Sequence, residues 1–222
     1  MSFVFYSNHA FDHRPALLDS VRVVANAESW HVRATLPTFL SILFFRQQFM
    51  VSSLALCGAL DICISLLSDS QHEVRQSSKT CLSGLLRLVS TEHVNTLSSQ
   101  FVAMCDAGST ALGSAKRSRL LSGSSKNAGP SVSELRTRHA GVLGLAAIVG
   151  AHPFDVPSWM PSLLLKLASH VNDPAPIKPT VKEVFSEFWA SHQDAWPLTK
   201  LVFDPDQLVE LQNLLVSSSY FM

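Results

Sequence analysis

Residues 69–75 read Asp69-Ser70-Gln71-His72-Glu73-Val74-Arg75. The order Ser-x-x-Glu is a capping box, in which the side chains of Ser70 and Glu73 accept hydrogen bonds from free backbone N–H groups where a helix begins. The positions that follow are apolar at helical spacing, at Val74, Cys81, Leu82, Leu85, Leu86 and Val89. The stretch therefore predicts a turn that leads into an amphipathic helix.

Helical spacing continues on both sides of this turn. Before it, the pattern predicts helices over residues 14–27, 29–49 and 53–67. Pro37 marks an expected kink in the second of these helices, and the third is apolar nearly all round, which indicates a helix covered on several sides. After it, a further helix is expected over residues 92–106. Strict alternation of apolar and polar residues, which would indicate a strand, is absent.

The acidic turn at residues 69–75, followed by Val-Arg, resembles the inter-helix turn of HEAT repeats. Helices joined by short links favour antiparallel pairs, and stacked pairs bury one continuous core. We therefore predict an all-α fold, an α-solenoid of HEAT-like antiparallel helix pairs with a flexible C-terminal tail.

The composition changes at residues 107–130 to Gly, Ser, Lys and Arg. Such a stretch buries too little apolar surface to offset the entropy of ordering it, so we expect a flexible loop between repeats. Its basic cluster, Lys116, Arg117 and Arg119, is either a plain solvated loop, a nuclear localisation patch or a phosphate contact.

A second capping box, formed by Ser131 and Glu134, predicts a helix over residues 131–151. Gly141, Gly144 and Gly150 lie on one stripe of this helix, where small residues let a neighbouring helix approach closely. A phosphate cradle is the alternative, but these glycines follow a helical period and do not follow a strand. One further helix is expected to end at about residue 170, and another is expected over residues 179–192. A last capping box, at residues 204–207, predicts a final helix that faces inward with Leu208, Leu211, Leu214 and Leu215.

The composition is that of a globular chain. Of 222 residues, 47% are hydrophobic, and 17 basic residues balance 17 acidic ones, so no global field favours nucleic acid or a membrane surface. The apolar runs are shorter than the roughly 18 residues that a membrane span needs, and residues 1–6 lack the features of a signal peptide. The four cysteines lack C-x-x-C spacing, which favours buried thiols over disulfides or a metal site. These features predict a cytosolic or nuclear protein.

The sequence contains no H-E-x-x-H, G-x-S-x-G, Walker A or dinucleotide motif, and its nine histidines are scattered singly. His139 has apolar neighbours, which favours a hydrogen-bonded core or interface histidine over a ligand. The tryptophans lie near helix ends and indicate wedges between helices before they indicate a binding cage. We therefore expect no enzyme activity, no cofactor and no metal.

The last six residues are Ser217-Ser218-Ser219-Tyr220-Phe221-Met222. A three-serine spacer that ends in two aromatic residues and a carboxylate has no evident core to fill. We expect it either to be held by another molecule or to fold back as a frayed terminus.

Several stretches together resemble the C-terminal region of the large single-chain HEAT-repeat proteasome activators, the proteasome activator complex subunit four family. The resemblance covers residues 29–222 and rests on Ser29-Trp30-His31-Val32-Arg33, residues 138–145, Phe154-Asp155-Val156-Pro157-Ser158-Trp159-Met160-Pro161, Asn172-Asp173-Pro174 and residues 206–217. It implies an ATP-independent activator that caps the core proteasome, and a chain of this length would be a fragment or a split gene product.

In that family a C-terminal hydrophobic-Tyr-X motif docks between alpha-ring subunits of the core proteasome. By position, Tyr220 is the hydrophobic residue, Phe221 stands in the tyrosine place and Met222 supplies the carboxylate. Phe221 departs from the motif because it lacks the hydroxyl, so the resemblance implies docking more strongly than full gate opening. It also implies acetylated histones as partners, a link to DNA repair, and a location in nucleus and cytoplasm.

These expectations divide the chain into an N-terminal segment with the first helix (1–28), HEAT-like repeats (29–106), the basic loop (107–130), a C-terminal HEAT-like domain (131–216) and a proteasome-docking tail (217–222). No membrane and no direct nucleic-acid partner are expected. The alternative function is a generic HEAT-repeat scaffold or transport adaptor with an inert tail.

Overall fold

The computed structural model describes residues 14–49, 52–106 and 131–219, and these are helical with no strand among them. The sequence prediction of an all-α solenoid is therefore confirmed. The elements, in chain order, are α1 (Arg14–Ala25), α2 (Trp30–Arg46), α3 (Ser53–Leu66), α4 (His72–Leu86), α5 (Thr91–Asp106), α7 (Val132–Gly150), α8 (Met160–Ala168), α9 (Ile177–His192), α10 (Trp196–Thr199), the 3-10 helix η2 (Lys200–Val202) and α11 (Pro205–Ser219). The expected loop at 107–130 lies outside the described residues.

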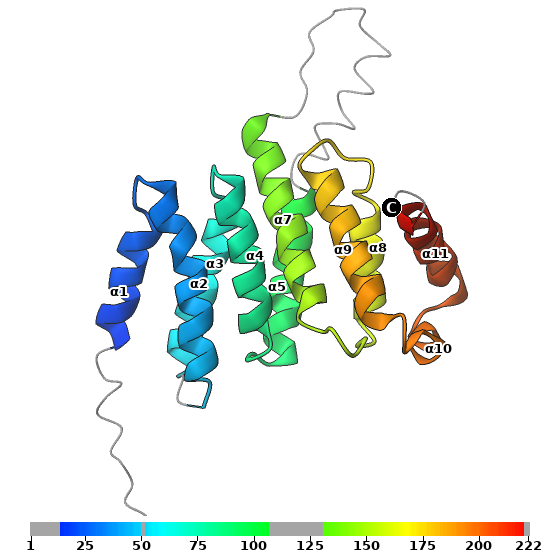
Figure 1. Ribbon diagram of the computed structural model, residues 1–222, viewed down its shortest axis with the longest axis horizontal. Coiled ribbons are helices and arrows are strands. Elements are labelled where there is room, and N and C mark those ends of the chain that lie inside the picture. The colour runs from blue at the N-terminus through cyan, green and yellow to red at the C-terminus, as the bar shows by residue number, and fades with distance from the viewer. Residues whose placement is uncertain (1–13, 50–51, 107–130, 220–222) are drawn as a thin grey trace, which may run out of the picture.

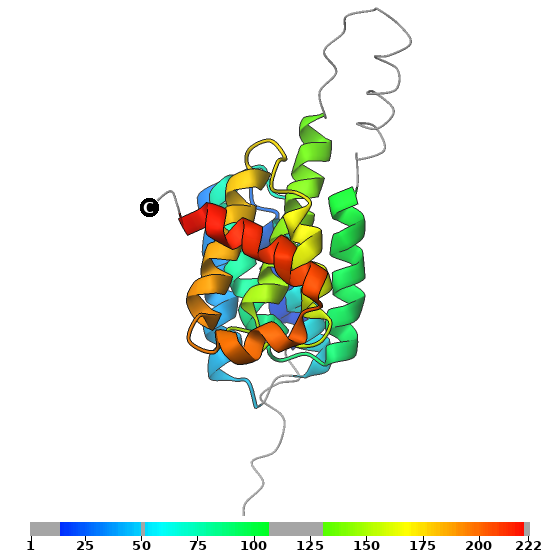
Figure 2. The same cartoon turned by 90° about the vertical axis from the view of Figure 1, so that its right-hand side faces the viewer.

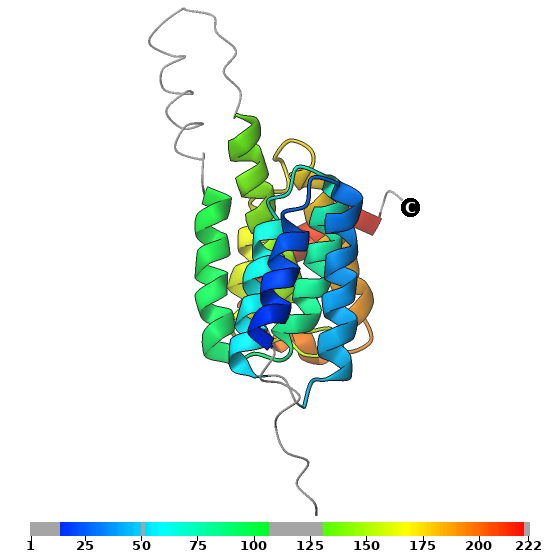
Figure 3. The same ribbon diagram turned by 90° about the vertical axis from the view of Figure 1, so that its left-hand side faces the viewer.

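The helices form a row of antiparallel neighbours that runs from α1 at one end to α11 at the other (Figure 1). Viewed from the α1 end, the row has two layers, with α2 and α4 on one side and α3 and α5 on the other (Figure 3). Helix α4 packs on α2, α3 and α7, and α7 packs on α4, α5, α8 and α9. Because each pair covers the next, one core runs along the whole row.

Helix α7 is the centre of this core. Every residue from Arg138 to Val149 is buried, and its N-terminus has the predicted capping box. The Glu134 N–H donates to Ser131 Oγ (3.2 Å), and the Ser131 N–H donates to Glu134 Oε2 (2.9 Å). The box thus satisfies two backbone donors where the helix begins.

Two glycines of the stripe on α7, Gly141 and Gly144, face α5, whereas Gly150 faces Ser83 of α4, so neighbouring helices approach the stripe closely, as the sequence predicts. A Cβ atom at Gly141 would lie 2.7 Å from both the Cys105 nitrogen and the Phe101 oxygen, and one at Gly144 would lie 2.5 Å from Cγ of Phe101. No side chain fits at such distances. The phosphate-cradle alternative is wrong, because α5 covers Gly141 and Gly144 and Ser83 of α4 lies against Gly150.

Other local predictions need correction. The capping box at Ser70 and Glu73 does not form, since α4 begins at His72 and the Gln71 N–H donates to Asp69 Oδ1 at 2.8 Å. Helix α2 ends at Arg46, not at residue 49. Helix α3 is covered on several sides, as predicted, since it packs on α1 and α4 and most of its apolar residues are buried, although Leu54 is 78% exposed.

The cysteines are free thiols, and three of them are buried, as expected. Cys57 is exposed, which the apolar pattern of α3 did not indicate. Within the described part of the chain, no helix combines the length and the apolar character needed to cross a bilayer.

Candidate functional site

The residues predicted to bind the proteasome, Tyr220, Phe221 and Met222, lie outside the described residues. The predicted localisation patch of Lys116, Arg117 and Arg119 does as well. What the structure does describe is the helix that leads to the tail. The backbone of α11 extends to Ser219, so the three serines continue the helix and are not an extended spacer that begins at residue 217.

Helix α11 crosses the end of the row obliquely and packs on α8 and α9 (Figure 2). Its start is set locally: Pro205 occupies the first position, where a missing N–H is tolerated, and the Asp204 N–H donates to Gln207 Oε1 at 3.0 Å. Leu211 is buried and Leu208 is half-buried against the core, as predicted. The tail therefore leaves from a helix that is anchored to the solenoid.

The link between α9 and α11 carries exposed apolar side chains. Trp196 packs edge-on against Trp189, with ring centroids 5.2 Å apart, and lies 6.3 Å from the Phe203 ring. These contacts and the packing of Trp196 against the core confirm the wedge role predicted for Trp196, whereas Trp189 is an exposed residue of α9. They hold α10 and η2 so that Leu198 and Leu201 are 72% and 75% exposed. We call these two residues the α10 patch.

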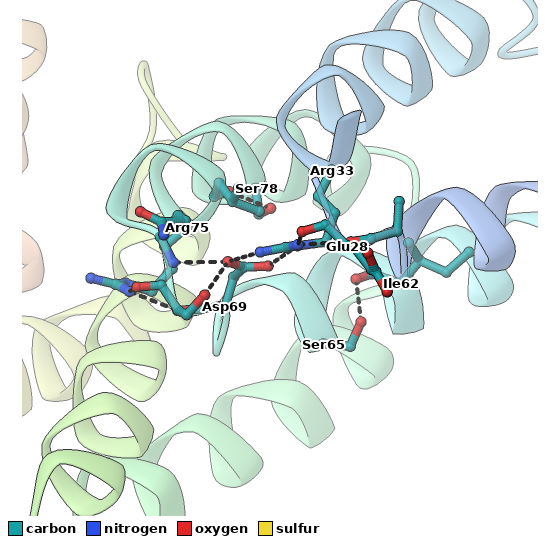
Figure 4. Close-up of polar contacts among 11 residues, drawn as sticks. Glu28, Arg33, Ile62, Ser65, Asp69, Arg75 and Ser78 are labelled. Carbon is teal, nitrogen blue, oxygen red and sulfur yellow. Dashed lines mark hydrogen bonds and ion pairs between the residues drawn. The ribbon is translucent and has the colours of Figure 1, made fainter. Parts of the chain in front are cut away.

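The turns between helices are held by ion pairs that join neighbouring helix pairs. Arg33 of α2 donates two hydrogen bonds to the Asp69 carboxylate, from Nε to Oδ2 at 2.6 Å and from Nη2 to Oδ1 at 2.9 Å (Figure 4). Arg75 of α4 donates to the backbone oxygens of Asp69 and Ser70, at 2.7 and 3.1 Å. Burial raises the pKa of Asp69, but the hydrogen bonds from Arg33 and Gln71 outweigh it, so the net pKa lies below the ordinary value.

The turn between α8 and α9 repeats this arrangement. Asp173 Oδ2 lies 3.2 Å from Arg138 Nη1 of α7 and 2.9 Å from His170 Nδ1. In both turns an arginine on the second helix of one pair reaches an aspartate in the turn of the next pair, 36 and 35 positions later. The two ion pairs thus link successive helix pairs of the row.

His139 is a core residue, as predicted. Its side chain is buried on α7, and Nε2 lies 3.0 Å from Thr180 Oγ1 of α9. Burial, with smaller effects from Arg75 and His72, lowers the pKa of His139 to about 3. The imidazole is therefore neutral at pH 7 and links two helices of the row.

Two grooves open between helices on the layer that contains α2, α4, α7 and α9. The larger, of about 550 Å³, lies between α2 and α4 and includes Ile42, Phe45 and Leu88 in its lining. The smaller, of about 180 Å³, lies between α7 and α9. Across residues 14–49, 52–106 and 131–219, no group of three or more His, Cys, Asp or Glu side chains is arranged to hold a metal ion.

The sequence did not reveal α10, η2 or the two aspartate ion pairs. A Trp-Pro step at residues 196–197 was the one local signal for α10, because proline is favoured in the first turn of a helix. The ion pairs join residues far apart in the chain, and no local pattern identifies both partners.

Comparison with known proteins places this architecture in one family. Residues 135–222 match the family model described as proteasome activator complex subunit 4-like, C-terminal. The chain is 40% identical over 209 residues to proteasome activator complex subunit 4 of Homo sapiens and 41% identical over 209 residues to subunit 4B of Danio rerio. It is 30% identical over 209 residues to proteasome activator subunit 4 of Arabidopsis thaliana.

These alignments cover 93%, 93% and 94% of this chain but 11% of each relative. The chain thus spans about a tenth of the length of the relatives it matches. The matched family model describes a C-terminal region and extends to residue 222, so it includes the predicted docking motif of Tyr220, Phe221 and Met222. The chain belongs to the proteasome activator subunit 4 family and corresponds to its C-terminal region.

Proposed function

We propose that this chain binds the alpha ring of the core proteasome without ATP and favours opening of its gate to peptide and protein substrates. The observation that carries the proposal is the match over nearly the whole chain to relatives named as proteasome activators. In this proposal the chain's part in degradation is regulatory and not enzymatic, in keeping with the names of these relatives.

The proposed anchor is the tail Tyr220-Phe221-Met222. Three extended residues beyond Ser219 reach roughly 10 Å, enough to enter a pocket between two subunits while α11 stays at the surface. A terminal carboxylate that pairs with a cation of the partner contributes roughly 1.5–3 kcal/mol, and each buried aromatic side chain contributes about as much. Association costs at least about 4 kcal/mol, so the tail alone binds weakly.

A second contact must therefore act together with the tail. The α10 patch suits this role because it lies at the same end of the row as α11 and exposes two leucines that have no core to fill (Figure 1). The tail leaves from the C-terminal end of α11, and this patch lies just before the N-terminal end of the same helix, so the 15 residues of α11 separate them by roughly 20 Å. Because both belong to one solenoid, each contact with the partner raises the effective concentration of the other. Burying a leucine is worth about 1.5–3 kcal/mol, which is roughly a tenfold change or more in affinity.

Leu201→Asp tests the second contact. We expect it to weaken binding to purified core proteasome by about tenfold or more. The matched control is Val132→Asp, because Val132 is 73% exposed, much like Leu201 at 75%, but lies at the start of α7. If the two variants bind equally, the α10 patch is not part of the interface.

The gate is tested by peptide hydrolysis. Purified core proteasome should hydrolyse a fluorogenic peptide faster when the chain is added, and no ATP should be needed. Phe221→Tyr restores the hydroxyl of the family motif and should raise this stimulation further, because the hydroxyl supplies a hydrogen bond that phenylalanine cannot make. Binding without any stimulation, in both forms, would favour the scaffold function.

We further propose that the chain is present in nucleus and cytoplasm and that Lys116, Arg117 and Arg119 direct the nuclear fraction. Support comes from the clustering of basic residues in a segment without acidic ones. Replacing all three by alanine should shift a fluorescently tagged chain towards the cytoplasm. An unchanged distribution would make the cluster a plain solvated loop.

A further inference from the structure

Two cysteine thiols meet between the helices of one pair. Cys63 of α3 and Cys81 of α4 lie with their sulfur atoms 3.5 Å apart, and their side chains are 0% and 1% exposed. They flank the turn that Asp69 and Arg33 hold, and they are 18 positions apart in the chain. Helix pairing, and not sequence proximity, therefore brings the two sulfurs together.

This thiol pair also borders a groove. Cys81 belongs to the lining of the groove of about 550 Å³ between α2 and α4, as does Ser41. A hydroperoxide as small as hydrogen peroxide is close to water in size, so the groove has ample room for it. Cys63 lies behind Cys81, where it can reach the other sulfur.

The surroundings distinguish the two sulfurs. Hydrogen bonding to Cys81, together with burial, raises the pKa of Cys63 well above its ordinary value. Hydrogen bonds from Cys63 and Ser41 lower the pKa of Cys81, against the opposing effect of burial. The thiolate is the form that reacts with peroxides, so Cys81 is the nucleophile and Cys63 is the resolving thiol.

We propose that Cys63 and Cys81 form a peroxide-sensitive thiol pair that closes into a disulfide between α3 and α4. In the first step the Cys81 thiolate attacks one oxygen of hydrogen peroxide, the O–O bond breaks, and hydroxide leaves. In the second step the Cys63 thiol attacks the sulfenic sulfur of Cys81, the S–O bond breaks, and the hydroxide leaves as water with the proton that the Cys63 thiol gives up. The hydroxide of the first step takes up the proton that Cys81 lost when it ionised. The two thiols lose two electrons, which reduce the peroxide to two molecules of water, and a dithiol reductant reverses the change.

The disulfide would act on the solenoid and not on its tail. A bond of about 2.05 Å requires each sulfur to move by less than an ångström from its present position. The link closes a loop around the 69–75 turn, which restricts the unfolded chain and makes this part of the row more resistant to unfolding. Because the pair lies far from the α10 patch in the sequence, this inference does not depend on the proposed proteasome contact.

The test is to treat the reduced full chain with hydrogen peroxide, alkylate the remaining thiols and map the cysteine peptides by mass spectrometry. We expect a Cys63–Cys81 linked peptide in the folded chain. Cys105 is the internal control: it is buried, and burial raises its pKa to about 12, so it should react at least about tenfold more slowly. Cys57 is exposed and should oxidise without joining the linked peptide.

Single variants assign the roles. Cys63→Ser should accumulate a sulfenic acid at Cys81 that a dimedone probe traps, whereas Cys81→Ser should leave Cys63 unlabelled. Circular dichroism of each variant confirms that it is folded. The proposal is overturned if the folded wild-type chain gives no linked peptide while Cys57 oxidises, or if the link forms only after unfolding in urea.

Discussion

The contact of α5 with the glycine stripe of α7 gives the sharpest prediction about stability. Replacing Gly144 by alanine would place a Cβ atom 2.5 Å from Cγ of Phe101, a ring with no exposed surface. Phe101 cannot move aside because it is enclosed by the core. Overpacking of this kind typically costs about 1–3 kcal/mol or more, while alanine in place of glycine inside a helix gains roughly 1 kcal/mol.

We therefore expect Gly144→Ala to lower the free energy of unfolding by up to about 2 kcal/mol. Gly84→Ala is the matched control, because Gly84 lies inside α4 and has nothing within 4 Å of the added Cβ. That variant should gain roughly 1 kcal/mol. The same substitution should thus lower the free energy of unfolding at Gly144 and raise it at Gly84.

Equilibrium unfolding in urea, followed by circular dichroism, measures both changes. The double variant Gly144→Ala with Phe101→Leu removes the ring that the new methyl group meets, so the two effects should not add. If Gly144→Ala stabilises the protein as Gly84→Ala does, α5 does not lie as close to α7 as the structure indicates.

Three further predictions concern charged groups. Asp69→Asn should lower the free energy of unfolding by roughly 1.5–3 kcal/mol at pH 7, because it weakens charge-assisted hydrogen bonds from Arg33. Since the folded pKa of Asp69 is depressed, its contribution is complete above about pH 4 and is lost as the pH falls through the folded value, so the two unfolding curves should converge in acid. The folded pKa of His139 is about 3, whereas in the unfolded chain this histidine takes up a proton near pH 6.5. The free energy of unfolding should therefore fall as the pH drops from about 6.5 towards 3. His139→Gln should flatten the dependence of stability on pH in that range. Asp106→Asn should change the free energy of unfolding by less than about 1 kcal/mol, although Asp106 Oδ1 lies 2.6 Å from Lys166 Nζ, because both side chains are partly exposed. A larger loss would show that this surface ion pair contributes more to stability than its exposure suggests.

The helices were predictable because their apolar residues repeat at helical spacing. The start of α7 was also predictable, since Ser131 and Glu134 are three positions apart and act on each other. The same pattern at Ser70 and Glu73 failed because the Ser70 hydroxyl donates instead to Asp69 Oδ1, at 3.3 Å, and Asp69 is held by Arg33 of the preceding pair. A tertiary contact thus displaced a local one, and a local pattern cannot reveal it.

The candidate site was predictable in part. The family, and with it the role expected of Tyr220, Phe221 and Met222, followed from motifs quoted from the sequence, and the comparisons confirm the family. The α10 patch was not predicted, because a helix of four residues has too few positions to show a period. The pairing of Cys63 with Cys81 was not predicted either, since their contact depends on how α3 packs on α4.

The affinity of purified core proteasome for the chain with and without Met222 tests the central claim most directly. Deleting Met222 moves the terminal carboxylate by one residue, whereas Met222→Ala leaves it in place and removes only the side chain. The account predicts that the deletion weakens binding by about tenfold or more, in line with the loss of a charge-assisted hydrogen bond, and that Met222→Ala has a much smaller effect. Equal binding by the deletion variant and the unaltered chain would show that the tail is not the anchor.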